Sequence, residues 1–264
     1  MRAIFVLLQL LLLVSRALSV HAPLHFRNSA SNSSIVVLGA AGFIGFHLSA
    51  ALRESGVDVF AYDTFTNSHY SPSYKYQRAW ALLLQHRVDI SHQNVCAGQD
   101  LSELLTIRGV SHIVYLGLGD SVRSENIDEN GVDSCFKKLF EMSKYSAEVL
   151  HRQSPIIVYA FPSQLDCGST NCDISQVNVR IQSYAFEQNT KYDVNSIGLL
   201  IPDALGPWQR LDRSPYTLLT EGTFSEKENS SIEFSFVGDI ARGIVHVMKY
   251  CKGTHLFYFA LVCI

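Results

Sequence analysis

The sequence predicts an α/β protein built on a doubly wound parallel sheet. Three observations support this prediction: short apolar segments alternate with longer helical ones, a glycine-rich turn follows the first apolar segment, and an aspartate ends the second. The expected strands are 35–38, 57–62, 87–90, 112–116, 155–160, 195–201 and 255–264, and the expected helices are 46–52, 77–85, 101–107, 130–148, 177–189 and 240–249. Such alternation is typical of parallel strands covered by helices on both faces.

The first expected strand runs directly into the turn Gly39-Ala40-Ala41-Gly42-Phe43-Ile44-Gly45. In this pattern Gly39 allows the tight turn, Gly42 lets a phosphate approach the backbone, and Gly45 lets the next helix lie close to the strand. Phe43 and Ile44 lie between Gly42 and Gly45 and are candidate cofactor-binding residues, because the N-terminus of the helix that follows favours an anion. A simple glycine cap is the alternative, but the strand–turn–helix context favours a Rossmann-type dinucleotide site.

An acidic residue, Asp63, ends the second expected strand, 24 residues after Gly39. A carboxylate at this position binds the adenosine ribose hydroxyls, and its charge repels a 2′-phosphate. We therefore expect NAD rather than NADP as the cofactor. Asp89 and Ile90, at the end of the third expected strand, are further candidate cofactor-binding residues.

The N-terminal residues 1–22 are predicted to form a signal peptide, because Arg2 precedes the apolar run 4–14 and small or apolar residues follow at a suitable cleavage position. The run is shorter than the ~20 residues that span a bilayer. A short membrane anchor and a buried helix are the alternatives. We expect passage through the secretory pathway, with the ER or Golgi lumen or the exterior as destination, and a polar linker at 23–34.

The rest of the composition is that of a globular protein, with a net charge of −3 and no basic excess of the kind that nucleic-acid binding requires. In the secretory pathway Asn32 and Asn229 become candidate glycosylation acceptors. Of the 6 cysteines, Cys167 and Cys172 are spaced for a small-loop disulfide. Unpaired buried cysteines are the alternative, and no metal-site pattern is present.

The glycine turn is similar to that of the extended short-chain dehydrogenases/reductases. The segment from Val57 through Asp63 to 78–83 resembles UDP-glucuronate 4-epimerases in particular. The resemblance extends over roughly 34–260. It implies a Rossmann domain at 35–201 that binds NAD, and a C-terminal lobe at 202–264, shorter than in the family, that binds a UDP-sugar. It also implies isomerase activity, in which the cofactor oxidises the sugar at C4 and returns hydride to the other face, and it leaves a homodimer open.

The family's catalytic group consists of a Tyr-x-x-x-Lys pair and a Ser or Thr hydroxyl. Ser163 aligns with the hydroxyl. When the segment 205–208 is aligned with the family's Tyr-Gly-Pro-Trp, the tyrosine and lysine positions fall on Ile174 and Asn178. Tyr184 follows on the same helix, ten residues further on and on a different face, so we do not expect it to replace the missing tyrosine.

The resemblance also places two arginines near the substrate. Arg123 is retained after the fourth strand, and Arg210 follows Gly206-Pro207-Trp208-Gln209 as a phosphate-binding arginine does in the family. A solvated loop arginine is the alternative for Arg210. A helix asparagine of the family falls on Cys135.

The sequence therefore predicts an NAD-binding, nucleotide-sugar epimerase/dehydratase-like protein without the family's proton-transfer pair. An active epimerase, a catalytically silent lumenal binding or regulatory module, and a non-functional product of a truncated reading frame are the three hypotheses. The apolar segment 256–264 motivates the third.

Overall fold

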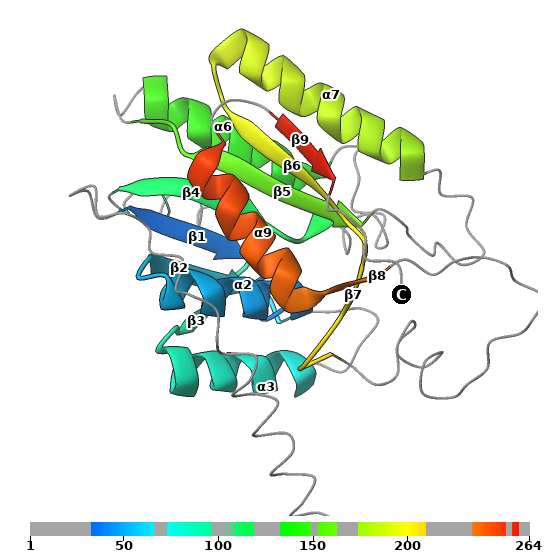
Figure 1. Cartoon of the computed structure of the whole chain (residues 1–264). Coiled ribbons are helices and arrows are strands. Elements are labelled where there is room, and N and C mark those ends of the chain that lie inside the picture. Colours follow the sequence, from blue (N-terminus) through cyan, green and yellow to red (C-terminus); the bar gives the residue numbers. More distant parts are fainter. Residues whose placement is uncertain are drawn as a thin grey trace, which may run out of the picture.

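A single parallel sheet forms the centre of the protein (Figure 1). The computed structural model describes residues 33–65, 73–96, 104, 107, 109–118, 133–148, 153–162, 174–209, 234–251 and 255–258. Within these ranges seven strands pair in the order β3-β2-β1-β4-β5-β6-β9, and every neighbouring pair is parallel. The strands are β1 (Ser34–Leu38), β2 (Asp58–Asp63), β3 (Ile90–His92), β4 (Val110–Tyr115), β5 (Ile156–Pro162), β6 (Ser196–Ile201) and β9 (His255–Tyr258). This topology confirms the predicted doubly wound fold.

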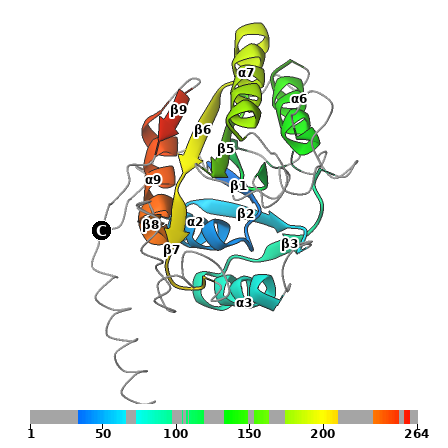
Figure 2. The same ribbon diagram turned by 90° about the vertical axis from the view of Figure 1, so that its right-hand side faces the viewer.

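Helices cover both faces of the sheet, as Figure 2 shows from the side. The helices are α2 (Phe43–Glu54), α3 (Ser73–Ala81) with its π-helical continuation η1 (Leu82–His86), α6 (Ser134–Glu148), α7 (Ile174–Tyr192) and α9 (Val237–Tyr250). Along β1, Ile35 and Val37 join the core formed with α2 and α9, while Val36 and Leu38 join the core formed with α6 and α7. A strand buried on both faces needs a continuous apolar run, which is what the sequence of β1 provides.

The third strand differs from the expectation of 87–90. In the structure η1 ends at His86, the following Arg87 has a left-handed backbone (φ 56°), and the N–H of Val88 still bonds back to the Leu82 carbonyl at 3.2 Å. The chain is therefore free to pair with β2 only from Ile90 onward, where Ile90 lies opposite Ala61. The expected strand was placed about two residues too early.

The expected boundary at residue 201 does not separate the last elements from the Rossmann layer. β9 pairs with β6 at the end of the main sheet, and α9 packs against α2. Among the described strands, β7 (Asp203–Leu205) and β8 (Phe234–Phe236) form a separate, two-stranded parallel sheet. Of the expected strand 255–264 the described part is 255–258, and the expected helix 101–107 lies almost entirely outside the described residues, as do the signal peptide and most of the linker.

No helix in the described part of the chain combines the length and apolar character that crossing a membrane requires.

Candidate dinucleotide-binding site

The carboxyl ends of β1 and β2 meet at one edge of the sheet, where ligands bind in doubly wound folds. Leu38, the last residue of β1, lies opposite Tyr62 of β2. The Tyr62 carbonyl accepts hydrogen bonds from the N–H groups of Gly39 (2.9 Å) and Ala40 (3.1 Å). These two bonds fix the start of the glycine turn against the end of β2, so the turn and Asp63 form one rigid corner.

Each glycine of the turn stands where another residue would be strained, Gly39 by its backbone conformation and Gly42 and Gly45 by collision with backbone. Gly39 has φ +90°, a conformation that other residues rarely adopt. A Cβ at Gly42 would lie 2.9 Å from the carbonyl oxygen of Gly39, and one at Gly45 would lie 2.1 Å from the same oxygen. The first turn of α2 can therefore lie against the loop only with glycine at these positions.

The N-terminus of α2 presents backbone donors to the sheet edge. Gly42, the N-cap, is extended (φ −64°, ψ 168°) and makes no side-chain cap, and the first turn contains no acidic residue. The N–H groups of Phe43 and Ile44 open the helix, where helical N–H groups have no partner within the helix. This end of the helix carries the positive pole of its dipole, so it can accept an anion such as a pyrophosphate.

Asp63 lies beside this turn and is held by three donors. Its carboxylate accepts the N–H of Ala41 (3.0 Å), the N–H of Phe65 (2.8 Å) and the Nζ of Lys75 (2.9 Å), and its side chain is only 2% exposed. A carboxylate offers about four acceptor positions, so the donors of the described residues leave about one of them untaken. Asp63 thus secures the glycine turn.

Lys75 was missed by the sequence reasoning. It comes from the first turn of α3, twelve residues after Asp63, and no local pattern distinguishes it from a solvated helix lysine. Only the folding of α3 against the end of β2 brings its ammonium group to Asp63.

Asp89 and Ile90 do not lie at the same end of the sheet as Asp63. Asp89 is exposed and precedes β3, and Ile90 lies opposite Ala61, two residues before the end of β2. The residues that leave β3 at the ligand edge are Asn94, which is exposed, and Val95, which is buried.

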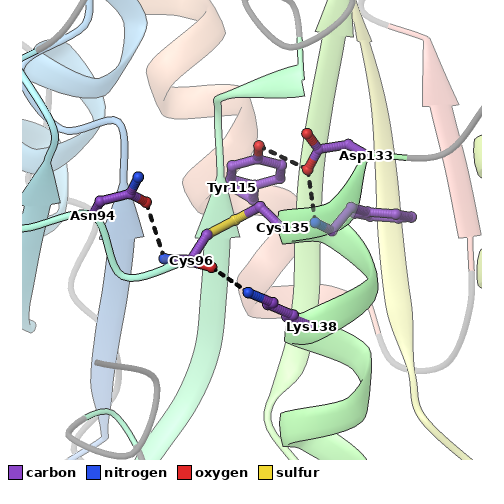
Figure 3. The surroundings of a disulfide bond; sticks show 7 residues. Asn94, Cys96, Tyr115, Asp133, Cys135 and Lys138 are labelled. Atoms are coloured by element: carbon purple, nitrogen blue, oxygen red, sulfur yellow. Dashed lines mark hydrogen bonds between the residues drawn. A yellow bond between two sulfur atoms is a disulfide. The ribbon is translucent and has the colours of Figure 1, made fainter. Parts of the chain in front are cut away.

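A disulfide between Cys96 and Cys135 closes this side of the site (Figure 3). The two Cα atoms are 5.0 Å apart, although the residues are separated by 39 positions. That separation explains why the sequence did not reveal the pairing. Cys251 is a free thiol in the structure, whereas the expected pair Cys167 and Cys172 lies outside the described residues.

A buried arginine joins the glycine turn to a distant segment. The guanidinium of Arg78 donates to the Ala41 carbonyl (3.2 Å) and, through Nε and Nη2, to the Trp208 carbonyl (3.1 and 2.9 Å). His47 on α2 donates from Nε2 to the Pro207 carbonyl at 2.9 Å. Trp208 has φ +66°, so its carbonyl is directed to Arg78 by a backbone conformation uncommon for a large residue. The turn 206–209, predicted to lead to the substrate, is therefore fixed on the cofactor corner.

The positions expected for the proton-transfer pair lie at the start of α7. Ile174 is its first residue, and Asn178 lies one turn later and is half-buried. Tyr184 instead packs between α6 and α7, with its ring centroid 5.6 Å from that of Phe140. Tyr159 on β5 is buried, and burial raises its pKa above the usual range, which disfavours a phenolate. Ser163, Arg123 and Arg210 lie outside the described residues.

Strand order, glycine turn and the aspartate after β2 together define a Rossmann-type nucleotide-binding domain. Comparison with known proteins shows that residues 35–153 match the model of the NAD dependent epimerase/dehydratase family. This part of the chain is therefore similar to that family.

Curated relatives and solved structures agree with this similarity. UDP-glucuronate 4-epimerase 4 of Arabidopsis thaliana is 28% identical over 247 residues, which are 86% of this chain and 54% of the relative. UDP-glucuronate 4-epimerase 3 of the same plant is 28% identical over 239 residues, 83% of this chain and 53% of the relative. The chain thus spans about half the length of these relatives.

The fold is similar to those of two bacterial NAD complexes. UDP-glucuronic acid 4-epimerase from Bacillus cereus, in complex with NAD, superposes with a TM-score of 0.61 at 20% identity, covering 86% of this chain and 78% of that one. dTDP-glucose 4,6-dehydratase from Bacillus anthracis, in complex with NAD, gives a TM-score of 0.64 at 16% identity, and the match covers 86% of this chain and 75% of that one.

Proposed function

We propose that this chain binds NAD and a UDP-sugar but does not epimerise the sugar at the rate of an intact family member. The corner formed by the glycine turn and Asp63 carries the cofactor part of this proposal. The pyrophosphate would meet the N–H groups of Phe43 and Ile44, and the adenosine ribose would meet the remaining acceptor of Asp63. The adenine then extends toward β3, the next strand outward, and reaches Asn94 and Val95.

Loss of the proton-transfer pair carries the catalytic part. Of the 12 tyrosines in the chain, none is followed four residues later by lysine, and the aligned positions hold Ile174 and Asn178. Neither an alkyl nor an amide side chain can accept a hydroxyl proton near neutral pH. Loss of a positioned acid–base group typically costs about 10²–10⁴-fold in rate, so two losses leave only residual turnover.

The UDP-sugar as second ligand is supported by the fixed turn 206–209. This turn resembles the family segment that precedes a phosphate-binding arginine, and Arg78 and His47 attach it to the cofactor corner. Arg210 would then bind the diphosphate, Arg123 would contact the substrate and Ser163 would lie at the reacting hydroxyl. The relatives that carry the name UDP-glucuronate 4-epimerase make UDP-glucuronate the first substrate to test.

The test is to titrate the purified chain with NAD by calorimetry and thermal unfolding, and to assay UDP-glucuronate conversion. We expect NAD to raise Tm by mass action and conversion to stay near background. Gly42→Val should abolish the NAD-dependent rise. Gly56→Asn is the matched control, because Gly56 lies just past the other end of α2, where a side chain meets open space and asparagine tolerates the positive φ.

Two outcomes would contradict the proposal. Turnover near that of an intact epimerase would show that another group supplies the base. An NAD-dependent rise in Tm that persists in Gly42→Val would exclude binding at the glycine turn.

A gain-of-function variant tests the catalytic part: Ile174→Tyr combined with Asn178→Lys should raise turnover above that of the wild-type chain if only the proton-transfer pair is missing.

We further propose a location in the secretory pathway. The signal-peptide pattern at 1–22 supports it, and so does the Cys96–Cys135 bond, since disulfides persist mainly in oxidising compartments. Sensitivity of the expressed protein to a glycosidase, lost in Asn32→Gln/Asn229→Gln, would test this location.

A homodimer is the assembly that the exposed face of α7 favours. Val179 and Phe186 are 60% and 66% exposed and lie seven residues apart on the same face, and Tyr145 on α6 is 46% exposed. Phe186→Glu should convert the dimer to a monomer in light-scattering measurements, and a wild-type monomer would refute the assembly.

A further inference from the structure

We infer that the Cys96–Cys135 disulfide positions the adenosine end of the dinucleotide site, and that the affinity for NAD depends on this bond. The inference rests on the proposed function, because it concerns the NAD site described above. The inference is based on the position of the bond. The bond joins the loop that leaves β3 at the ligand edge to the first turn of α6, the helix between β4 and β5 along the chain.

The loop next to Cys96 is connected directly to the Asp63 corner. The N–H of Gln93 donates to the backbone carbonyl of Asp63 at 3.2 Å, and the ring of His92 bonds to the Thr64 carbonyl at 2.9 Å. Asn94 and Val95 follow at once, and Asn94 Oδ1 accepts the N–H of Cys96 at 3.2 Å (Figure 3). A displacement of Cys96 therefore moves the residues that face the adenine and pulls on the backbone that carries Asp63.

The other end of the bond lies in the protein core. Cys135 is buried, and the N-terminus of α6 is capped by Asp133, whose carboxylate accepts the N–H of Phe136 at 2.8 Å and the Tyr115 hydroxyl at 3.0 Å. Tyr115 ends β4 in the middle of the sheet, so the cap fixes α6 to the core. Through the disulfide, α6 restrains the position of Cys96 in the loop.

Without the disulfide, one hydrogen bond between the loop and α6 remains in the described part of the chain, beside the packing of Val95 in the core that α6 lines. Lys138 Nζ donates to the Cys96 carbonyl at 2.6 Å. A single hydrogen bond from a flexible lysine side chain orders a loop less than a covalent link does, because the lysine loses rotamer entropy in making it. The reduced loop then has to be ordered at the moment of binding, which weakens affinity.

The bond is open to chemical control. Cys96 is half-buried rather than fully buried, so a small dithiol can reach its sulfur. Reduction transfers two electrons and two protons from the dithiol to the S–S bond, giving two protein thiols and one oxidised dithiol.

The experiment compares the affinity for NAD and for ADP-ribose in four forms of the full chain: oxidised, reduced by a dithiol and thiol-blocked, Cys96→Ser/Cys135→Ser, and the control Cys251→Ser. We expect both ligands to bind about tenfold more weakly to the reduced and double-serine forms, with Cys251→Ser unchanged, since ordering a short loop costs about this factor. ADP-ribose lacks the nicotinamide, so an equal loss for both ligands assigns the effect to the adenosine half.

Equal NAD affinity in folded oxidised and reduced protein would overturn the inference and leave the proposed function intact. So would peptide mapping that finds Cys96 and Cys135 unlinked in the oxidised chain. Absence of NAD binding by the oxidised wild-type chain would overturn both. Where the double-serine variant does not fold, the reduced wild-type protein, checked by circular dichroism, supplies the comparison, and faster hydrogen exchange at 93–96 than in the oxidised form is the accompanying expectation.

Discussion

Acidification should destabilise this protein through one buried histidine. His112 lies on β4 beneath α9, and burial lowers its pKa from 6.5 to about 4, with the Met248 carbonyl partly opposing the shift. Between these two values the unfolded chain binds a proton that the folded chain does not, so stability is complete above about pH 7 and falls as the pH is lowered toward 4. For these pKa values the loss between pH 7.5 and pH 5 is about 2 kcal/mol.

The assay is urea unfolding of wild-type protein and His112→Leu at pH 7.5, 6 and 5, followed by circular dichroism. The stability difference between the two proteins should shift by about 2 kcal/mol in favour of the variant as the pH falls, or about 4–8 °C in Tm. His47, whose pKa is also lowered by burial, contributes in the same direction but is present in both proteins and cancels. Parallel pH profiles for the two proteins would refute the reasoning.

Three further substitutions test contacts that position the site, each by equilibrium unfolding. Gly45→Ala would place a methyl group 2.1 Å from the Gly39 carbonyl oxygen, so it should destabilise by about 1–3 kcal/mol, and an unchanged midpoint would show that the loop can move aside. Arg78→Met leaves the Ala41 and Trp208 carbonyls without this donor and should cost about 3 kcal/mol, with Arg78→Lys recovering only part; full recovery by lysine would contradict the bridging role. Asp133→Ala removes the α6 cap and should cost about 1–2 kcal/mol, more than Asp133→Asn, and the reverse order would be inconsistent with capping.

The parts of the site that the sequence could predict depend on neighbours close in the chain. The glycine turn and Asp63 follow two adjacent strands, and the parallel pairing of β1 with β2 is enough to bring them together. Apolar runs identified these strands, because β1 is buried along its whole length and β2 becomes buried toward its carboxyl end, at Ala61 and Asp63.

The parts of the site that the sequence could not predict depend on contacts between distant segments. Lys75 meets Asp63, Arg78 meets Trp208 and Cys96 meets Cys135 only after α3, the turn 206–209 and α6 have packed. β3 was misplaced because it has only three residues, and two of them are polar, so periodicity gives no register.

The position of β9 has a consequence for how the chain folds during synthesis. β6 is buried along its whole length and pairs with β5 on one side and β9 on the other. Until residues 255–258 have left the ribosome, β6 is the open edge of an otherwise complete sheet, with unpaired backbone groups along an apolar strand. Such an edge recruits other strands, so a nascent chain that stalls just before β9 exposes an aggregation-prone strand, and chaperones would be needed at that stage.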